Sequence, residues 1–199
     1  MNKNNNKIII VINGRGGCGK DTLCDITAKH YKVRNVSSIT PIKELAAIAG
    51  WDGNKDPKSR KMLADLKQLF VEYNDYCNNY IMKHACEFAE SDEEIMFVHI
   101  RESDEIKKFM KTASSIDNVK CISLLVRRTT DDGYGGSLLG NSADDDVENM
   151  AYDAVYENNK SLDLLEADFM LFISDLIWIY IECEKIVLNY SWYFDIISI

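Results

Sequence analysis

The segment KIIIVINGRGGCGKDTLC, residues 7–24, decides the fold of this chain. It begins with a run of β-branched apolar residues, Ile8–Ile12, which is short and apolar enough to form a buried strand of a parallel sheet. A glycine-rich stretch follows at residues 14–19, and apolar residues then return at helical spacing. A strand, a glycine loop and a helix in this order are the context that a phosphate-binding loop, or P-loop, requires.

The residue types of the loop indicate how it would bind phosphate. Its glycines allow consecutive backbone N–H groups to turn toward one anion, and the helix that begins at Lys20 adds the positive end of its dipole. Lys20 supplies a mobile positive charge for the outer phosphates. We therefore expect a nucleotide to contact Gly14, Arg15, Gly16, Gly17, Cys18, Gly19, Lys20, Asp21 and Thr22.

The position after Lys20 departs from the usual P-loop pattern. It holds Asp21, where most P-loops have a Ser or Thr whose hydroxyl binds Mg²⁺. A carboxylate is a hard oxygen ligand that can bind Mg²⁺ directly or through water. We predict that Asp21 is a metal ligand and that Thr22, next in line, assists it.

Composition limits the class of protein. A chain of 199 residues suits one α/β domain, and a net charge of -9 argues against a nucleic-acid partner, whose backbone calls for a basic face. The six cysteines include no CxxC pair and are typical of reduced thiols in a cytosolic protein. The polar start MNKNNNK does not resemble a signal peptide, and the longest uncharged run near the end, 186–194, is far shorter than the ~20 residues of a membrane span. We expect a cytoplasmic protein without a membrane partner.

Hydrophobic periodicity predicts strands that alternate with helices along the chain. Such alternation favours an α/β fold in which helices cover both faces of a parallel sheet. The strands are expected at 8–12, 33–36, 94–100, 121–126 and 152–156, and the helices at 20–31, 40–49, 59–89 with a break near 78–79, from 103 onward, and 161–173.

Charged residues follow two of these strands, at the edge of the sheet where ligands bind in open α/β folds. Arg101 and Glu102 come directly after the strand 94–100, and Arg127 and Arg128 end the strand 121–126. We predict that Arg101 binds an acceptor phosphate and that one of the two later arginines neutralises charge on the transferred group. Glu102 either helps to hold the metal ion or only complements the dipole of the next helix.

The motifs together resemble the P-loop nucleoside and deoxynucleoside monophosphate kinases, most closely the phage-type deoxynucleoside monophosphate kinases, whose P-loop typically reads GKDT. The resemblance extends to SITPIK at 38–43, the segment around Arg60, VHIRESDEI around Arg101, and YDAVYENNKSLDLLE at 152–166. These segments cover most of residues 7–173, but only the P-loop is highly specific to the family.

The resemblance implies a single kinase domain over 1–199 with the three-layer sandwich of P-loop NTPases. Residues 40–90 would form an acceptor-binding helical region in which Lys43 and Arg60 contact the substrate, and residues 127–148 would form a lid. ATP with Mg²⁺ would be the donor and a (deoxy)nucleoside monophosphate the acceptor, giving ADP and the diphosphate. Asn158 would contact the edge of the adenine base, although a role in the turn explains an asparagine at this position equally well. The apolar extension 175–199 would either pack back on the sheet or form a contact in a homodimer.

Two departures from the family keep alternatives open. His99 stands where related kinases often carry an Asp that helps to hold magnesium, and the lid has no arginine between Arg128 and the last strand. The alternatives are a P-loop kinase for another small acceptor, such as dephospho-coenzyme A or a sugar acid, an NTP-hydrolysing switch, and a nucleotide-binding protein without catalysis. The absence of an NKxD guanine motif weakens the switch.

Overall fold

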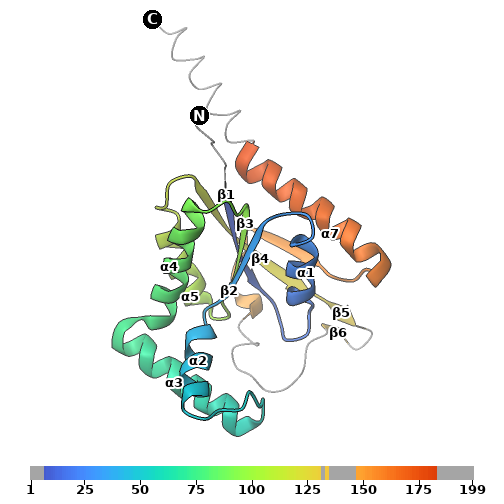
Figure 1. Ribbon diagram of the computed structural model, residues 1–199. Coiled ribbons are helices and arrows are strands. Elements are labelled where there is room, and N and C mark those ends of the chain that lie inside the picture. The colour runs from blue at the N-terminus through green and yellow to red at the C-terminus, as the bar shows by residue number, and fades with distance from the viewer. Residues whose placement is uncertain (1–6, 131–132, 135–146, 183–199) are drawn as a thin grey trace, which may run out of the picture.

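The computed structural model describes residues 7–130, 133–134 and 147–182, and a parallel sheet forms its middle layer (Figure 1). The strand order is β2-β3-β1-β4-β7, and every neighbouring pair is parallel. This confirms the predicted α/β sandwich. The bounds are β1 (Lys7–Asn13), β2 (Val33–Ser37), β3 (Ile95–His99), β4 (Val119–Arg127) and β7 (Ala154–Glu157).

Helices cover both faces of the sheet and bury two apolar cores. Ile8 and Ile10 of β1 face α1 (Lys20–Thr27) and α7 (Leu162–Ile177), whereas Ile9 and Val11 face α4 (Tyr76–Glu90) and α5 (Ser103–Ala113). Successive residues of a strand point to opposite faces, so a strand covered on both sides must be apolar throughout. Each fully buried isoleucine stabilises the fold by about 1.5–3 kcal/mol, and β1 is therefore a rigid support for the loop that follows it.

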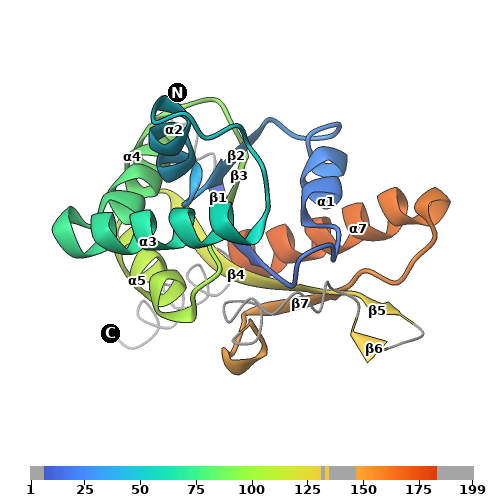
Figure 2. The ribbon, with the colours of Figure 1, turned by 90° about the horizontal axis from the view of Figure 1, so that it is seen from below.

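Two further helices, α2 (Thr40–Ile48) and α3 (Pro57–Asn74), lie at the carboxyl edge of the sheet, below it in Figure 1 and toward the viewer in Figure 2. Asp56 caps α3 by accepting a hydrogen bond from the Ser59 N–H at 2.7 Å. No residue of α3 is buried, so this helix packs less tightly than α4 or α5. Over the described ranges, no helix combines the length and the apolar character needed to cross a membrane.

The long helix expected over 59–89 is divided at Asp75, not near 78–79. Asp75 has the left-handed backbone conformation (φ 57°), which Asp tolerates better than most residues. Its carboxylate accepts a hydrogen bond from Asn78 Nδ2 at 3.1 Å and pairs with Lys108 Nζ at 2.7 Å. These contacts hold the corner between α3 and α4.

Several other boundaries differ from the prediction, and for two of them the hydrogen bonds show the cause. Helix α1 ends at Thr27 rather than at residue 31, because the backbone bonds that follow tighten to i→i−3: Lys29 N–H donates to the Ile26 carbonyl at 3.1 Å and His30 N–H to the Thr27 carbonyl at 3.0 Å. Strand β7 begins at Ala154 rather than at 152, because the Asp153 carboxylate accepts hydrogen bonds from the Ser123 N–H and hydroxyl, both at 2.7 Å. The Asp153 side chain thus takes the place of the first backbone hydrogen bond between β4 and β7.

The remaining elements border the predicted lid and the C-terminal extension. A two-stranded hairpin, β5 (Thr129–Thr130) and β6 (Gly133–Tyr134), follows β4, and the 3₁₀ turn η1 (Val147–Asn149) precedes β7. The π-helical turn η2 (Trp178–Glu182) continues α7. The rest of the lid, 131–132 and 135–146, and the rest of the extension, 183–199, lie outside the described residues, so these two predictions stay open.

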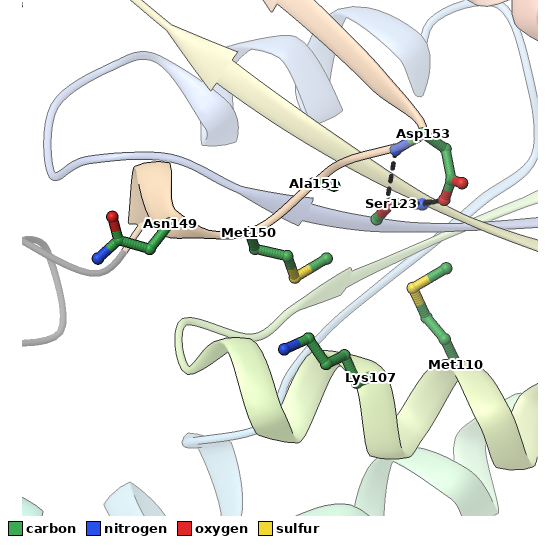
Figure 3. A pocket seen from close by; sticks show the side chains of 7 residues that line it. All are labelled: Lys107, Met110, Ser123, Asn149, Met150, Ala151 and Asp153. Atoms are coloured by element: carbon green, nitrogen blue, oxygen red, sulfur yellow. Dashed lines mark hydrogen bonds between the residues drawn. The ribbon is translucent and has the colours of Figure 1, made fainter.

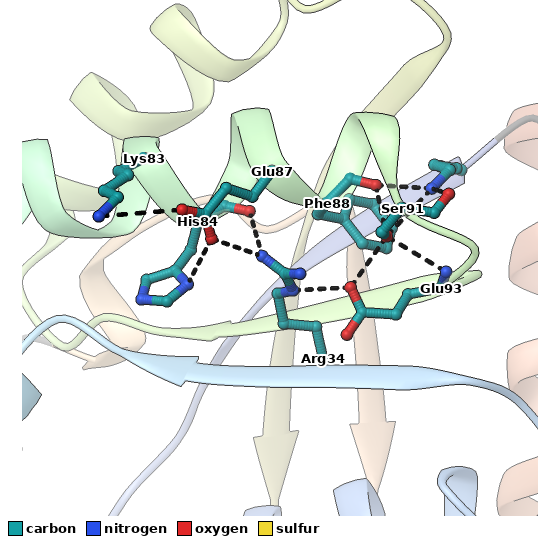
Figure 4. Close-up of polar contacts among 8 residues, drawn as sticks. Arg34, Lys83, His84, Glu87, Phe88, Ser91 and Glu93 are labelled. Carbon is teal, nitrogen blue, oxygen red and sulfur yellow. Dashed lines mark hydrogen bonds and ion pairs between the residues drawn. The ribbon is translucent and has the colours of Figure 1, made fainter.

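Polar contacts fasten the amino end of the sheet to the end of α4 (Figure 4). Arg34 of β2 donates to Glu93 at 2.7 Å and to the His84 carbonyl at 3.0 Å. Lys7 donates to the carbonyls of Phe88 and Ser91, each at 2.6 Å, and its burial lowers the pKa of the ammonium. These contacts hold the start of β1 and of β2 against the end of α4.

Candidate phosphate-binding site

The loop between β1 and α1 has a backbone that requires glycine at two positions. Gly14 and Gly19 have φ values of 146° and 97°. A Cβ atom would lie 2.4 Å from the Val126 carbonyl oxygen at Gly14 and 2.3 Å from Asn158 Nδ2 at Gly19. Both the dihedral angle and the space therefore exclude a side chain, as expected for a loop that brings its backbone close to a ligand.

Two buried asparagines support the loop. Asn13, the last residue of β1, accepts a hydrogen bond from the Gly14 N–H at 2.8 Å and donates to the Arg101 carbonyl at 3.0 Å. Asn158 donates from Nδ2 to the Cys18 carbonyl at 2.8 Å, and its own N–H bonds to the Arg127 carbonyl at 2.7 Å. The structure thus places Asn158 against the P-loop, and its predicted contact with adenine stays a prediction.

Sequence reasoning missed Asn13. A polar residue that ends an otherwise apolar strand was the available signal. Asn13 is 1% exposed, so its amide must find partners within the protein. It joins the first residue of the P-loop to the end of β3.

Lys20 is folded back over its own loop. Its Nζ donates to the carbonyl oxygens of Gly14 at 2.5 Å and of Arg15 at 3.0 Å. In the same loop, Arg15 Nε is buried without a hydrogen-bond partner. A bound phosphate would give both groups an anionic acceptor, so the residues of this loop fit a phosphate group.

The predicted metal ligands Asp21 and Glu102 have different surroundings. Asp21 and Thr22 are exposed in the first turn of α1 and offer oxygen atoms that suit Mg²⁺. The Glu102 carboxylate, in contrast, lies 2.5 Å from Lys67 Nζ. Within the described part of the chain no three His, Cys, Asp or Glu side chains are grouped as a metal site. Asp21 and Thr22 could supply only part of the ligands of a Mg²⁺ ion, and the phosphates of a bound nucleotide would supply others.

His99 is a half-buried structural histidine. Its Nε2 lies 2.8 Å from Asn35 Oδ1 and 3.8 Å from Cys24 Sγ. Burial lowers the pKa of His99 to about 4, so the ring is neutral at pH 7. It supplies no carboxylate at the end of β3.

The predicted acceptor-binding cations all lie on elements at the carboxyl edge. Arg101 is exposed after β3, Lys43 is exposed on α2, and Arg60 is exposed on α3, where its Nε donates to the Lys55 carbonyl at 2.8 Å. The fold thus brings these three elements to one edge of the sheet (Figure 2).

The two arginines after β4 differ in their surroundings. Arg127 pairs with two glutamates. Its Nη2 lies 2.6 Å from Glu148 Oε2, and its Nη1 lies 3.5 Å from Glu157 Oε1. The hydrogen bond to Glu148 contributes most to raising the pKa of Arg127 above its ordinary value. Arg128 is exposed. Of the two, Arg128 is therefore the one whose charge is less compensated by the described carboxylates.

A hollow of about 490 Å³ lies between α5 and the segment before β7 (Figure 3). None of the predicted site residues lines it. Its floor is the Ser123–Asp153 contact, and the other lining residues are Lys107, Met110, Asn149, Met150 and Ala151.

The chain was compared with protein families, curated proteins and solved structures. No protein-family model and no curated protein matches the chain. Among solved structures, a "putative kinase" from Chloroflexus aurantiacus J-10-fl is 11% identical with a TM-score of 0.50, over 86% of this chain and 96% of that one. TT1252 from Thermus thermophilus is 18% identical with a TM-score of 0.47, over 85% of this chain and 98% of that one. The first likeness extends over nearly the whole of that protein and shows a shared fold. The chain therefore shares the α/β fold of that protein, a parallel sheet between two layers of helices.

Proposed function

We propose that this protein is a kinase that transfers a phosphoryl group from ATP to a (deoxy)nucleoside monophosphate, giving ADP and the diphosphate. The observation that carries the proposal is the loop of residues 14–20 at the carboxyl edge of a parallel sheet. Its backbone excludes side chains at Gly14 and Gly19, and its Lys20 and Arg15 hold donors that a phosphate would satisfy.

On the donor side, the N–H groups of residues 14–20 and the Lys20 ammonium would hold the triphosphate. Lys20 would exchange the carbonyl oxygens of Gly14 and Arg15 for phosphate oxygens, which are stronger acceptors because they are charged. Asp21 and Thr22 would hold Mg²⁺, which would supply positive charge to offset the negative charge that develops during transfer.

On the acceptor side, the placement of cations favours a substrate that carries a phosphate. Two phosphate groups that meet at one site repel each other, so the acceptor phosphate needs cations of its own beyond Lys20. Arg101, Lys43 and Arg60 lie on three elements at the same edge, in a chain with a net charge of -9. A neutral nucleoside or sugar would not need them. Transfer would be in line, without a covalent intermediate, and Arg128 would stabilise the transferring group, a role worth roughly 10³–10⁵ in rate where tested.

The proposal is tested with Lys20→Ala in a coupled assay for ADP. The wild type should turn over with at least one nucleoside monophosphate and not with the matching nucleoside. The variant should be inactive but folded by circular dichroism, because Lys20 contacts loop carbonyls and not the core. Equal turnover by the two proteins, or a preference for nucleosides, would exclude the proposed reaction.

A nucleotide-binding protein without kinase activity is the second candidate. Two observations favour it, namely the neutral His99 at the end of β3 and the pairing of Arg127 with two glutamates. The two candidates differ in one result. Wild-type protein that binds a non-hydrolysable ATP analogue but produces no ADP with any monophosphate would establish the second.

A further inference from the structure

Lys67 of α3 reaches the end of β3. Its Nζ lies 2.5 Å from Glu102 Oε2, and its side chain is only 16% exposed although α3 has no buried residue. The predicted acceptor cations Lys43 and Arg60 are exposed by comparison. Lys67 is therefore a cation held between α3 and the carboxyl edge of the sheet.

The partner of Lys67 is joined to the P-loop through two hydrogen bonds. Glu102 follows Arg101, whose carbonyl accepts from Asn13 Nδ2 at 3.0 Å. The same asparagine accepts from the Gly14 N–H at 2.8 Å. The Lys67–Glu102 pair is thus connected to the first residue of the loop that would hold the donor phosphates.

A phosphate monoester would compete well with Glu102 for this ammonium. It carries a charge of about -1.5 to -2 at neutral pH and three acceptor oxygens, against one charge for a carboxylate. The Glu102 side chain is 41% exposed, but Oε2, the oxygen that faces Lys67, is itself buried and has no hydrogen-bond partner beside this ion pair. A phosphate with three charged acceptor oxygens can replace this single contact, and until then the negative charge of Glu102 repels a second anion.

We propose that Lys67 binds the phosphate of the acceptor and that Glu102 holds this lysine in place while the acceptor site is empty. The arriving phosphate takes Lys67 over from Glu102. This inference rests on the proposed function, which it deepens by naming a specificity-determining residue that selects phosphorylated acceptors over neutral ones.

The exchange differs from a simple tether between α3 and β3 in the sign of two substitutions. If the pair only tethers the helix, loss of either partner removes the same contact and affects the acceptor in the same direction. If Lys67 changes partner, removal of Glu102 takes away a competitor and a repelling charge, whereas removal of Lys67 takes away the ligand and leaves the repelling charge.

The test compares Lys67→Met, which keeps the apolar stem, with Glu102→Gln, which keeps the shape. Lys61→Gln is the matched control, because Lys61 lies on the same helix, is 76% exposed and pairs only locally with Asp65 among the contacts described. At saturating Mg²⁺, Lys67→Met should raise KM for the acceptor about 10- to 100-fold, the usual weight of a hydrogen bond to a charged group. Glu102→Gln should lower it about two- to fivefold. KM for ATP should stay the same in all three variants, and Lys61→Gln should match the wild type.

Equilibrium binding of the four common deoxynucleoside 5′-monophosphates to each protein, measured by calorimetry, separates this inference from the proposed reaction. Opposite changes in affinity without phosphoryl transfer would support the exchange and exclude the kinase. A higher KM for the acceptor in both Lys67→Met and Glu102→Gln would show that the pair only tethers α3, and it would be compatible with the proposed kinase reaction. Absence of monophosphate binding to the wild type at millimolar concentration would overturn the exchange as well.

Discussion

Gly19→Ala is the substitution whose cost the structure defines most closely. The new Cβ would lie 2.3 Å from Asn158 Nδ2, on a backbone with φ of 97°. The left-handed conformation costs an alanine roughly 1–2 kcal/mol. Displacing the Asn158 amide leaves the buried Cys18 carbonyl without its 2.8 Å hydrogen bond, which costs about 1–3 kcal/mol more. The free energy of unfolding should therefore fall by about 2–5 kcal/mol.

Gly17→Ala is the matched control for this prediction. Gly17 also has a positive φ, 80°, but a Cβ there would meet no atom within 4 Å. It should cost only the backbone strain of roughly 1–2 kcal/mol. Urea unfolding of the two variants, together with binding of a non-hydrolysable ATP analogue, measures the difference.

Asn158→Ala completes a double-mutant cycle with Gly19→Ala. Because the smaller side chain removes the obstacle, the double variant should lose less stability than the sum of the two single variants. Equal losses for Gly17→Ala and Gly19→Ala, or strict additivity with Asn158→Ala, would refute the packing of Asn158 against the loop.

Three further predictions follow from the site. His99 has a pKa of about 4 in the folded protein against an ordinary 6.5, so the folded state binds fewer protons and stability should fall as the pH drops from 6.5 to 4. The loss should reach up to about 3 kcal/mol, and His99→Gln, followed by thermal unfolding across this range, should lack that component; an identical pH profile for the two proteins would refute the shift. Asp21→Asn should raise the Mg²⁺ concentration that gives half the maximal rate, and an unchanged metal titration would remove Asp21 from the ion site. Arg101→Ala should raise KM for the acceptor about tenfold or more and leave KM for ATP nearly unchanged, since one charged contact is lost on the acceptor side; equal changes in both would contradict its role.

The sequence alone predicted those elements whose local residue pattern agrees with their environment in the folded protein. The apolar run 8–12 predicted a strand covered on both faces, and the glycines before Lys20 predicted the loop, because both patterns are required wherever that strand lies in the sheet. The order of the strands could not be derived in this way, since β3 inserts between β1 and β2 through contacts far apart in the chain.

Boundaries and partners were less predictable where a side chain replaces or ends the regular backbone pattern. Asp75 divides the helical segment and Asp153 delays β7, each through hydrogen bonds to residues that periodicity does not identify. Lys67 has no feature in the sequence that separates it from other helical lysines. Its pairing with Glu102 depends on how α3 crosses the edge of the sheet. The acidic partners of Arg127 lie 21 and 30 residues away and likewise depend on the fold.

The most direct test of the account follows the phosphorus atoms themselves. Wild-type protein is mixed with ATP, Mg²⁺ and a nucleoside monophosphate, and the products are resolved by ³¹P nuclear magnetic resonance. The account predicts that ADP and the acceptor's diphosphate appear in equal amounts, and that neither appears with Lys20→Ala. ADP accompanied by inorganic phosphate, with no new diphosphate, would show hydrolysis and contradict the assignment of this protein as a monophosphate kinase.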